Sequence, residues 1–499
     1  MELPLTPLDL LERARRLFPD RVGVVDGEIR RTYRDVAARC HRLGRALRDE
    51  IGIAPGDRVA WLCGNTSELL EAYFGVLLAG GTLLPLNIRM SAPELRFCLD
   101  DSGAVVLFRH PDQVDPHHRV PTVLIGDEYE ALLARQSDEL LDSPVTDESS
   151  VAELFYTSGS TGDPKGVLLT HRSLYLHAIH SALTNGIGGD DVVLHTIPLF
   201  HVNGWGTPHY LTGLGGVHIM LHRFDPEQVL HLIEAEAVTR LFLVPTMART
   251  LLDHPAMATT DTSSVNQVSV GGAPSGPELL AELEEAFGCI AISGYGMTES
   301  SPTLTRSLDK PGEPPSRERR ATTGLPILGA DVRVFDERDE EVPWDGVTAG
   351  EIVARSNHVM EGYWNRPEET AEALRGGWLR TGDVATVDPD GYLTIVDRKK
   401  DIIVSGGENV SSVQVEKAIA AHPDVVEVAV VGVPDQRWGE AVKAWVALRP
   451  GSTAEEDELG RWVRERLAGF KVPKHWMFVD ELPKGGTGKI QKSHLRERE

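Results

Sequence analysis

Apolar and polar residues alternate in a regular order through the middle of the chain. Apolar runs with the length of buried strands occur at 191–197, 216–221 and 240–244. Residues 226–238 instead have the spacing of a helix with one apolar face, and residues 246–253 have the same spacing. Strands that alternate with helices in this way predict an α/β fold, in which helices cover mostly parallel sheets.

The pattern changes in the last third of the chain. Short runs separated by turns at 330–355 predict a small β subdomain. The elements predicted after it are a strand at 391–396, a helix from about 413, strands at 425–433 and 441–448, and a helix that begins after Ser452 and Thr453. About 100 residues with their own helices and strands can fold independently. We therefore expect a large domain over 1–397, a connection at 398–400 and a smaller mobile α+β domain over 401–499.

Composition and charge narrow the classes of function. Against 50 basic residues stand 75 acidic ones, so the net charge of the 499-residue chain is −25, which disfavours binding to nucleic acid or to an anionic membrane. The longest apolar run, 74–86, contains two glycines and is shorter than the ~18 residues of a membrane span. The N-terminus has mixed charge rather than a signal sequence. We expect a cytoplasmic protein without stable membrane insertion, whose four scattered cysteines are reduced.

A glycine- and hydroxyl-rich segment follows the apolar strand at 154–156. Residues 156–166 read YTSGSTGDPKG, with three glycines, four serine or threonine hydroxyls and Lys165. Backbone N–H groups and hydroxyls in such a loop can donate to phosphate oxygens while the lysine supplies charge. A plain surface loop is the alternative interpretation. The segment lacks the GK[ST] ending of a Walker A loop and the register of a nucleophile elbow, which argues against a P-loop kinase and a serine hydrolase.

Four further segments carry chemistry. The sequence GYGMTE at 294–299 sets Tyr295, which can stack on a base, before Thr298 and Glu299, which suit a phosphate and its Mg²⁺. The other three are the tight turn GGAP at 271–274, WLRTGD with a carboxylate at Asp383, and PKGGTGK with Lys489 near the C-terminus.

In this order, and together with DRKKDIIVSGGENV at 397–410, these motifs resemble the adenylate-forming superfamily of acyl-CoA synthetases, peptide-synthetase adenylation domains and luciferases. The resemblance extends from about residue 10 to Lys492. It implies that a carboxylic acid attacks the α-phosphorus of ATP, that pyrophosphate leaves, and that the acyl group then passes to coenzyme A (CoA). ATP, Mg²⁺ and CoA are the implied cofactors and co-substrates.

The resemblance also assigns roles to individual residues. The implied ATP-binding residues are Thr157, Ser158, Gly159, Ser160, Thr161, Gly162, Lys165, Gly272, Ala273, Pro274, Ser293, Gly294, Tyr295, Gly296, Met297, Thr298, Asp383, Arg398 and Lys489. The implied catalytic residues are Lys489, Thr298, Glu299, His201 and Lys165. Thr157 and Glu299 would place Mg²⁺, Lys400 would be the hinge, and Gly406 and Gly407 would lie beside a tunnel for CoA.

The implied acyl site is centred on the segment FHVNGW at 200–205, which resembles bacterial fatty acyl-CoA synthetases. In those enzymes the tryptophan gates the fatty-acid tunnel and the histidine lies beside the carboxylate. The implied acyl-binding residues are His201, Val202, Asn203, Trp205, Gly271 and Gly296. A place for Trp205 in the hydrophobic core is the alternative.

Several alternatives stay open at this point. The acid can be a medium- to long-chain fatty acid or an aryl acid. The acceptor can be CoA, an amine, as in amide synthetases, or a carrier-protein thiol. A catalytically silent binding protein on the same fold is a more distant alternative. The implied partners are small molecules and not nucleic acid, and a homodimer is one option for the oligomeric state.

Overall fold

The computed structural model describes residues 3–157, 164–273, 275–398, 401–405, 408–435, 438–484 and 490–496. The chain divides into two compact units, one of Met1–Val332 with Ala354–Leu379 and one of Arg333–Val353 with Arg380–Glu499. The connection predicted at 398–400 falls inside the second unit, and Lys400 lies outside the described residues. The predicted domain boundary and hinge therefore stay predictions.

The first unit contains a nine-stranded sheet in the order β15-β14-β13-β12-β11-β9-β10-β1-β2. The strands are β1 (Val22–Asp26), β2 (Ile29–Thr32), β9 (Val192–Leu194), β10 (Val217–Ile219), β11 (Arg240–Leu243), β12 (Gln267–Val270), β13 (Ile290–Gly296), β14 (Thr303–Arg306) and β15 (Leu325–Pro326). From β13 to β1 every neighbouring pair is parallel, as the alternation of strands and helices predicts.

A second sheet in this unit has seven strands in the order β18-β8-β7-β4-β3-β5-β6. They are β3 (Arg58–Leu62), β4 (Thr82–Pro85), β5 (Val106–Arg109), β6 (Thr122–Leu124), β7 (Val151–Thr157), β8 (Lys165–Thr170) and β18 (Gly362–Tyr363). β7 and β8 form an antiparallel hairpin, and β18 pairs with β8 at the edge of the sheet. The candidate phosphate loop connects β7 to β8.

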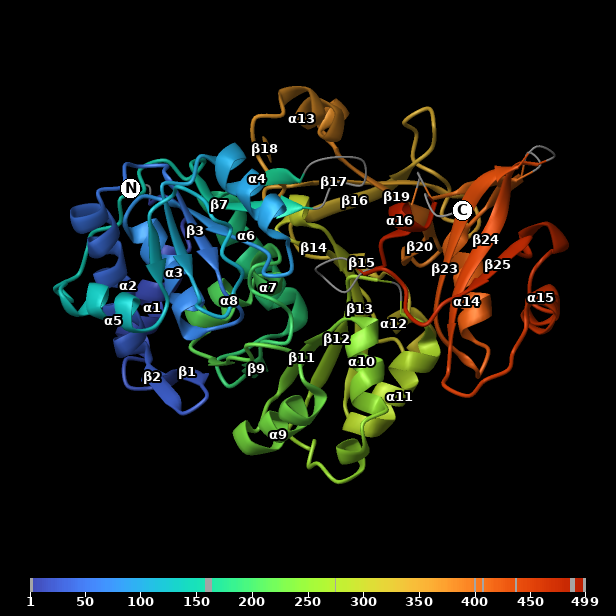
Figure 1. Ribbon diagram of the computed structural model, residues 1–499, viewed down its shortest axis with the longest axis horizontal. Helices are drawn as coiled ribbons and strands as arrows, with labels where there is room; N and C mark the ends of the chain where they lie inside the picture. Colours follow the sequence, from blue (N-terminus) through green and yellow to red (C-terminus); the bar gives the residue numbers. More distant parts are fainter. Residues whose placement is uncertain are drawn as a thin grey trace. The chain divides into compact units, whose positions relative to one another are not determined.

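Helices cover these sheets, and α10 and α11 lie along β11 to β13 in Figure 1. The helices of the first unit are α1 (Leu8–Leu17), α2 (Tyr33–Arg45), the π-helix η1 (Ala46–Ile51), α3 (Ser67–Leu78), α4 (Ala92–Ser102), α5 (Asp127–Ala134), α6 (His171–Asn185), α7 (Val202–Trp205), α8 (Thr207–Leu214), α9 (Pro226–Glu236), α10 (Pro245–Leu252), η2 (Pro255–Ala258), α11 (Pro277–Phe287), η3 (Thr298–Ser300), α12 (Arg317–Arg320), α13 (Pro367–Ala373) and η4 (Arg375–Gly377). α9 begins where the sequence predicts, because the Asp225 side chain caps it by accepting from the Gln228 N–H.

The second unit contains most of a four-stranded sheet in the order β16-β17-β19-β20 and a C-terminal five-stranded sheet. The elements are β16 (Ala330–Phe335), β17 (Gly350–Ser356), β19 (Leu379–Val387), β20 (Leu393–Arg398), β21 (Ile403–Ser405), β22 (Glu408–Val410), α14 (Ser412–Ala420), β23 (Val425–Asp435), β24 (Gly439–Leu448), α15 (Glu456–Arg464), η5 (Gly469–Lys471), β25 (His475–Phe478) and α16 (Lys492–Arg496). The predicted β subdomain and α+β C-terminal part are therefore present.

One predicted helix start is wrong. α15 begins at Glu456 with Glu455 as its N-cap, and not directly after Ser452 and Thr453. The Ser452 hydroxyl instead accepts from the Ala454 N–H at 3.2 Å. Ser452 thus closes a local turn before the helix, a use that competes with capping for the same kind of side chain.

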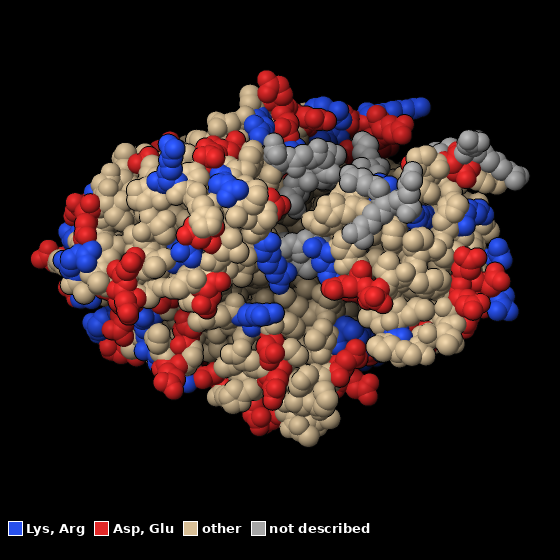
Figure 2. All heavy atoms as spheres, in the orientation of Figure 1, with Lys and Arg blue, Asp and Glu red and all other residues tan. Residues whose placement is uncertain are grey.

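The surface and the cysteines agree with the composition. Acidic and basic side chains are interspersed over the described part of the face in Figure 2. Among the described residues, the helices are all too short or too polar to cross a membrane. All four cysteines are free, and Cys40, Cys63 and Cys98 are buried, whereas Cys289 is partly exposed.

Candidate active site

The candidate phosphate loop lies at the tip of the β7–β8 hairpin. Thr157 and Lys165 pair across its base, where the Thr157 hydroxyl donates to the Lys165 carbonyl at 3.5 Å. Ser158, Gly159, Ser160, Thr161 and Gly162 lie outside the described residues. The two ends of the predicted loop are thus held together by the hairpin, whatever the loop between them contacts.

Lys165 is linked to Glu299 through Tyr363. The Lys165 ammonium forms an ion pair with Glu369 of α13 and lies 5.4 Å from the centroid of the Tyr363 ring. The Tyr363 hydroxyl donates to Glu299 Oε1 at 2.8 Å. Burial and the nearby Glu299 charge raise the pKa of Tyr363, so the phenol keeps its proton and acts as the donor. One aromatic residue therefore touches both a predicted phosphate-binding residue and a predicted Mg²⁺ ligand.

Backbone hydrogen bonds fix this arrangement. The Met360 N–H donates to the Glu299 carbonyl at 2.8 Å, and the Trp364 N–H donates to the Gly166 carbonyl at 2.7 Å. The segment 360–364 thereby connects the turn of GYGMTE to the strand after the phosphate loop. Tyr363 and Glu369 cannot be identified from the sequence, because a single aromatic or acidic residue outside a glycine-rich motif gives no chemical signal.

The GYGMTE segment forms the end of β13 and the turn into β14. A Cβ on Gly296 would lie 1.9 Å from the Pro302 carbonyl oxygen, so only glycine fits there. Thr298 and Glu299 follow in η3 and are buried. At the base of the motif, the Ser293 N–H donates to the Ser307 hydroxyl at 2.7 Å. The residues predicted to contact the nucleotide therefore lie on the β13–β14 hairpin and in its connecting turn.

The oxygen atoms of Thr157 and Glu299 suit a Mg²⁺ ion that binds together with a nucleotide. Within the described part of the chain, no group of three or more His, Cys, Asp or Glu side chains could hold a metal ion by itself. Mg²⁺ is typically held by one or two protein oxygens together with phosphate oxygens and water. Thr157 and Glu299 offer such oxygen donors, so they fit the ion only in company with a nucleotide.

The candidate acyl segment forms a left-handed turn. Five consecutive residues, 202–206, have positive φ values of 36°, 44°, 52°, 65° and 84°. Left-handed backbone costs about 1–2 kcal/mol for each residue with a Cβ, and Val202 is β-branched. Strain of this kind persists only where surrounding contacts enforce it, and it is common at functional sites.

Buried polar contacts hold this turn. The Asn203 side-chain amide donates to Glu153 Oε2 at 3.0 Å, and His209 Nε2 lies 3.1 Å from Glu153 Oε1. All three side chains are almost fully buried. Just before the turn, the Asn65 amide donates to the carbonyls of His195 and Ile197. The turn is thus anchored to Glu153 of β7, and the segment before it is anchored to the loop after β3.

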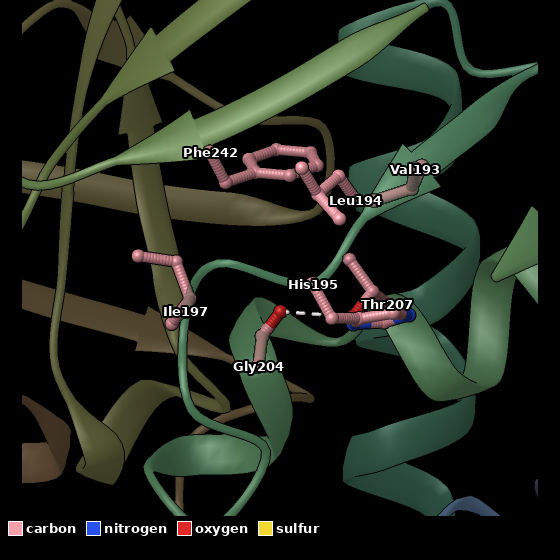
Figure 3. Close-up of a pocket in the computed structure, with 7 residues that line it drawn as sticks. All are labelled: Val193, Leu194, His195, Ile197, Gly204, Thr207 and Phe242. Atoms are coloured by element: carbon pink, nitrogen blue, oxygen red, sulfur yellow. Dashed lines mark hydrogen bonds between the residues drawn. The ribbon is translucent and has the colours of Figure 1, made fainter. Parts of the chain in front are cut away.

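A narrow pocket, with no room for a water molecule in this structure, lies beside this turn (Figure 3). Its lining residues are Val193, Leu194, His195, Ile197, Gly204, Thr207 and Phe242. The Trp205 ring meets the Phe242 ring edge-to-face, with centroids 5.9 Å apart at 82°. A Cβ on Gly271 would lie 2.8 Å from the indole, so glycine is needed where Trp205 packs. Trp205 is partly buried and packs against a hydrophobic core cluster that includes Ile197 and Phe242, two of the residues that line the pocket.

The polar side of this pocket is uncharged. Burial lowers the pKa of His195 to about 3, and His195 Nε2 lies 2.9 Å from His218 Nδ1. Thr212 hydrogen-bonds to the other nitrogen of His218 at 3.0 Å. A neutral histidine pair with a bonded hydroxyl at its end adds polarity to the pocket wall without adding charge.

The remaining predicted residues are located as follows. Asp383 and Arg398 lie opposite each other on β19 and β20 of the second unit. Gly272 has a φ of 78° in the turn after β12, next to the exposed Ala273, and His201 is partly buried before the left-handed turn. Pro274, Lys400, Gly406, Gly407 and Lys489 lie outside the described residues.

Comparisons with known proteins agree with this site. Residues 11–364 match the AMP-binding enzyme family, and residues 414–489 match the AMP-binding enzyme C-terminal domain. A feruloyl-CoA synthase from Amycolatopsis is 42% identical over 97% of both chains. ATP-bound MatB from Rhodopseudomonas palustris has a TM-score of 0.89 and 30% identity over 98% of both chains. The amide bond synthetase McbA from Marinactinospora thermotolerans has a TM-score of 0.86 and 30% identity over 98% of this chain and 99% of its own.

The two family matches lie on either side of residues 365–413, and the similarity to the relatives extends over 97–98% of the chain. The chain therefore belongs to the AMP-binding enzymes, as an adenylate-forming acid–CoA ligase.

Proposed function

We propose that this enzyme activates an aromatic carboxylic acid with ATP and transfers the acyl group to CoA. The acid carboxylate attacks the α-phosphorus, and the bond to the leaving pyrophosphate breaks. The CoA thiolate then attacks the acyl carbonyl and expels AMP. Charge neutralisation and positioning dominate such phosphoryl chemistry, because negative charge gathers at the reacting centre.

The proposed roles follow the site. Lys165 and Lys489 hold the phosphates, Thr298 contacts the α-phosphate, and Tyr295 stacks on the adenine. When bound, Mg²⁺ would neutralise phosphate oxygens beside Thr157 and Glu299. Asp383 and Arg398, whose positions are paired in the register of β19 and β20, bind the ribose. Rotation of the C-terminal domain about Lys400 would withdraw Lys489 and bring Gly406 and Gly407 beside the CoA tunnel.

The proposal of an aromatic acid rests on the aromatic pair Trp205 and Phe242. Trp205 and Phe242 meet edge-to-face, a geometry that a third ring can extend. The relative that is 42% identical is named for ferulate, an aromatic acid, which supports the same choice. A buried ring removes roughly 150 Å² of apolar surface from water, or about 4 kcal/mol at 25 cal/mol per Å². An aromatic acid should thus exceed acetate in kcat/KM by roughly 10²–10³-fold.

A panel of acids tests the proposal. Pyrophosphate release should depend on an aromatic acid such as cinnamic acid, and AMP release should also require CoA. A preference for octanoic acid over every aromatic acid would refute the aromatic assignment. The amide-synthetase alternative is supported by the likeness to McbA. It predicts AMP release that depends on an added amine and not on CoA.

A further inference from the structure

Arg306, the last residue of β14, is a buried cation without a partner. Its exposed fraction is 4%, and its Nε has no hydrogen-bond partner and no contact with solvent. Within the described ranges, its guanidinium donates no hydrogen bond and meets no carboxylate. Two buried aromatic side chains lie near it: the centroid of the Phe242 ring is 6.0 Å from Cζ, and the Tyr210 phenol interacts with the guanidinium electrostatically. Burial lowers the pKa of Arg306 to about 10.

Arg320, in the same unit, is a buried arginine with a structural role, and it can be compared with Arg306. Arg320 has an exposed fraction of 7%, and it donates to Asp309 and to Glu284, each at 2.7 Å. The two carboxylates raise the pKa of Arg320 against the effect of burial. Buried charges in proteins are usually paired in this manner. Arg306 therefore lacks the partners that a purely structural role would provide.

The register of the sheet places Arg306 on the face that carries the pocket. Arg306 pairs with Gly294 across β13 and β14, and its Nη1 lies 2.7 Å from the position of a Cβ on Gly294. In the neighbouring strands Phe242 pairs with Ser269, which pairs with Ile292. Paired residues face the same side, and so do residues two apart along a strand. Phe242, Gly294 and Arg306 therefore share one face.

We propose that Arg306 binds a second oxygen substituent of the acid, so that the substrates are oxygen-substituted aromatic carboxylic acids. This inference rests on the proposed function and narrows its substrate class. A guanidinium presents a fork of donors to carboxylate, phenol or ether oxygens. A site with a buried unpaired donor discriminates strongly against an analogue that lacks the acceptor, because the donor then stays unsatisfied.

Matched acids test this inference. Cinnamic acid is compared with 3-hydroxy-, 4-hydroxy- and 4-carboxycinnamic acid, by kcat/KM for pyrophosphate release and by calorimetric affinity without ATP. At least one oxygen-substituted acid should exceed cinnamic acid by roughly 10- to 150-fold, the range for a hydrogen bond to a charged group. The acid with the largest gain shows whether the acceptor is a carboxylate or a neutral oxygen.

Two variants assign that gain to the guanidinium. Arg306→Met should remove the preference and change the values for cinnamic acid by no more than a few-fold. Arg306→Lys should restore part of the preference, because it keeps the charge but not the fork. Equal losses for all four acids would place Arg306 at the reacting carboxylate or in the scaffold and overturn the inference.

The wild-type result separates this inference from the proposed function. Equal kcat/KM values for all four acids would refute this inference but not the proposed function, since aromatic acids would still be activated. Failure of every aromatic acid in the panel would refute the proposed function as well.

Discussion

Removal of the Arg306 charge should make the protein more stable. The folded-state pKa of about 10 lies 2.5 units below the ordinary 12.5, which corresponds to about 3 kcal/mol at 1.36 kcal/mol per unit. The contact with Phe242 offsets up to about 1 kcal/mol of this, because 6.0 Å is the outer limit of a cation–π interaction. Arg306→Met should thus stabilise the first unit by about 2–3 kcal/mol.

This free energy corresponds to a shift in the midpoint temperature of unfolding. Unfolding entropy of about 2.1 cal/mol/K per residue gives about 0.75 kcal/mol/K for the roughly 360 residues of the first unit. Calorimetry should therefore find the midpoint of the first unit about 3–4 °C higher in Arg306→Met. Because the lowered pKa lies near 10, the wild-type cation persists in both states below that pH. The difference should stay constant from pH 6 to 9, and wild-type stability should rise only as the pH passes through about 10.

Arg320→Met is the matched control. The exposed fraction of this arginine is similarly low, but its loss deprives Asp309 of its arginine partner and leaves Glu284 paired with Arg317 alone. Removal of one partner from a buried pair costs about 3–5 kcal/mol, so the midpoint should fall by about 4–7 °C. A lower midpoint for both variants would refute the view that Arg306 is an unpaired charge held for a ligand.

Three other changes probe the rest of the site. Tyr363→Phe keeps the ring beside Lys165 but loses the hydroxyl that donates to Glu299. The Kd of Mg·ATP, measured by calorimetry, should therefore rise roughly 10- to 150-fold. An unchanged Kd would exclude Tyr363 from the nucleotide site. Lys489→Ala should lower the rate of acyl-adenylate formation by about 10²-fold or more and spare thioester formation from supplied acyl-adenylate. Equal losses in both steps would show that Lys489 does not act in the first half-reaction alone. Trp205→Ala should broaden the acid profile, measured as kcat/KM over the panel, and leave the KM of ATP unchanged; an unaltered profile in a stable variant would exclude Trp205 from the acyl site.

Much of the fold could be predicted because strands and helices here alternate with clear apolar periods. α9, β10 and β11 all follow such periods and lie within a few residues of their predicted bounds. The α15 start was misplaced because a serine near a helix can close a turn as readily as it can cap. Local hydrogen-bonding choices of this kind depend on neighbours that one short segment does not specify.

Site residues can be proposed from sequence where a motif carries the chemistry, as with GYGMTE and with Asp383 and Arg398, which the structure pairs across β19 and β20. Tyr363 and Arg306 cannot, for different physical reasons. Tyr363 acts through a contact between segments that are 64 residues apart. Arg306 stands out only by its lack of a partner inside the protein, which no sequence pattern reveals.

The left-handed turn at 202–206 has a consequence for how relatives of this enzyme can diverge. Surface loops usually accept insertions and deletions with little effect. In this turn an added or removed residue would rotate His201 relative to Trp205 and would also break the contact between Asn203 and Glu153. Substrate range in this lineage should therefore change by substitution within a loop of fixed length. Homologues with different acids should differ in the side chains of these five positions and keep their number.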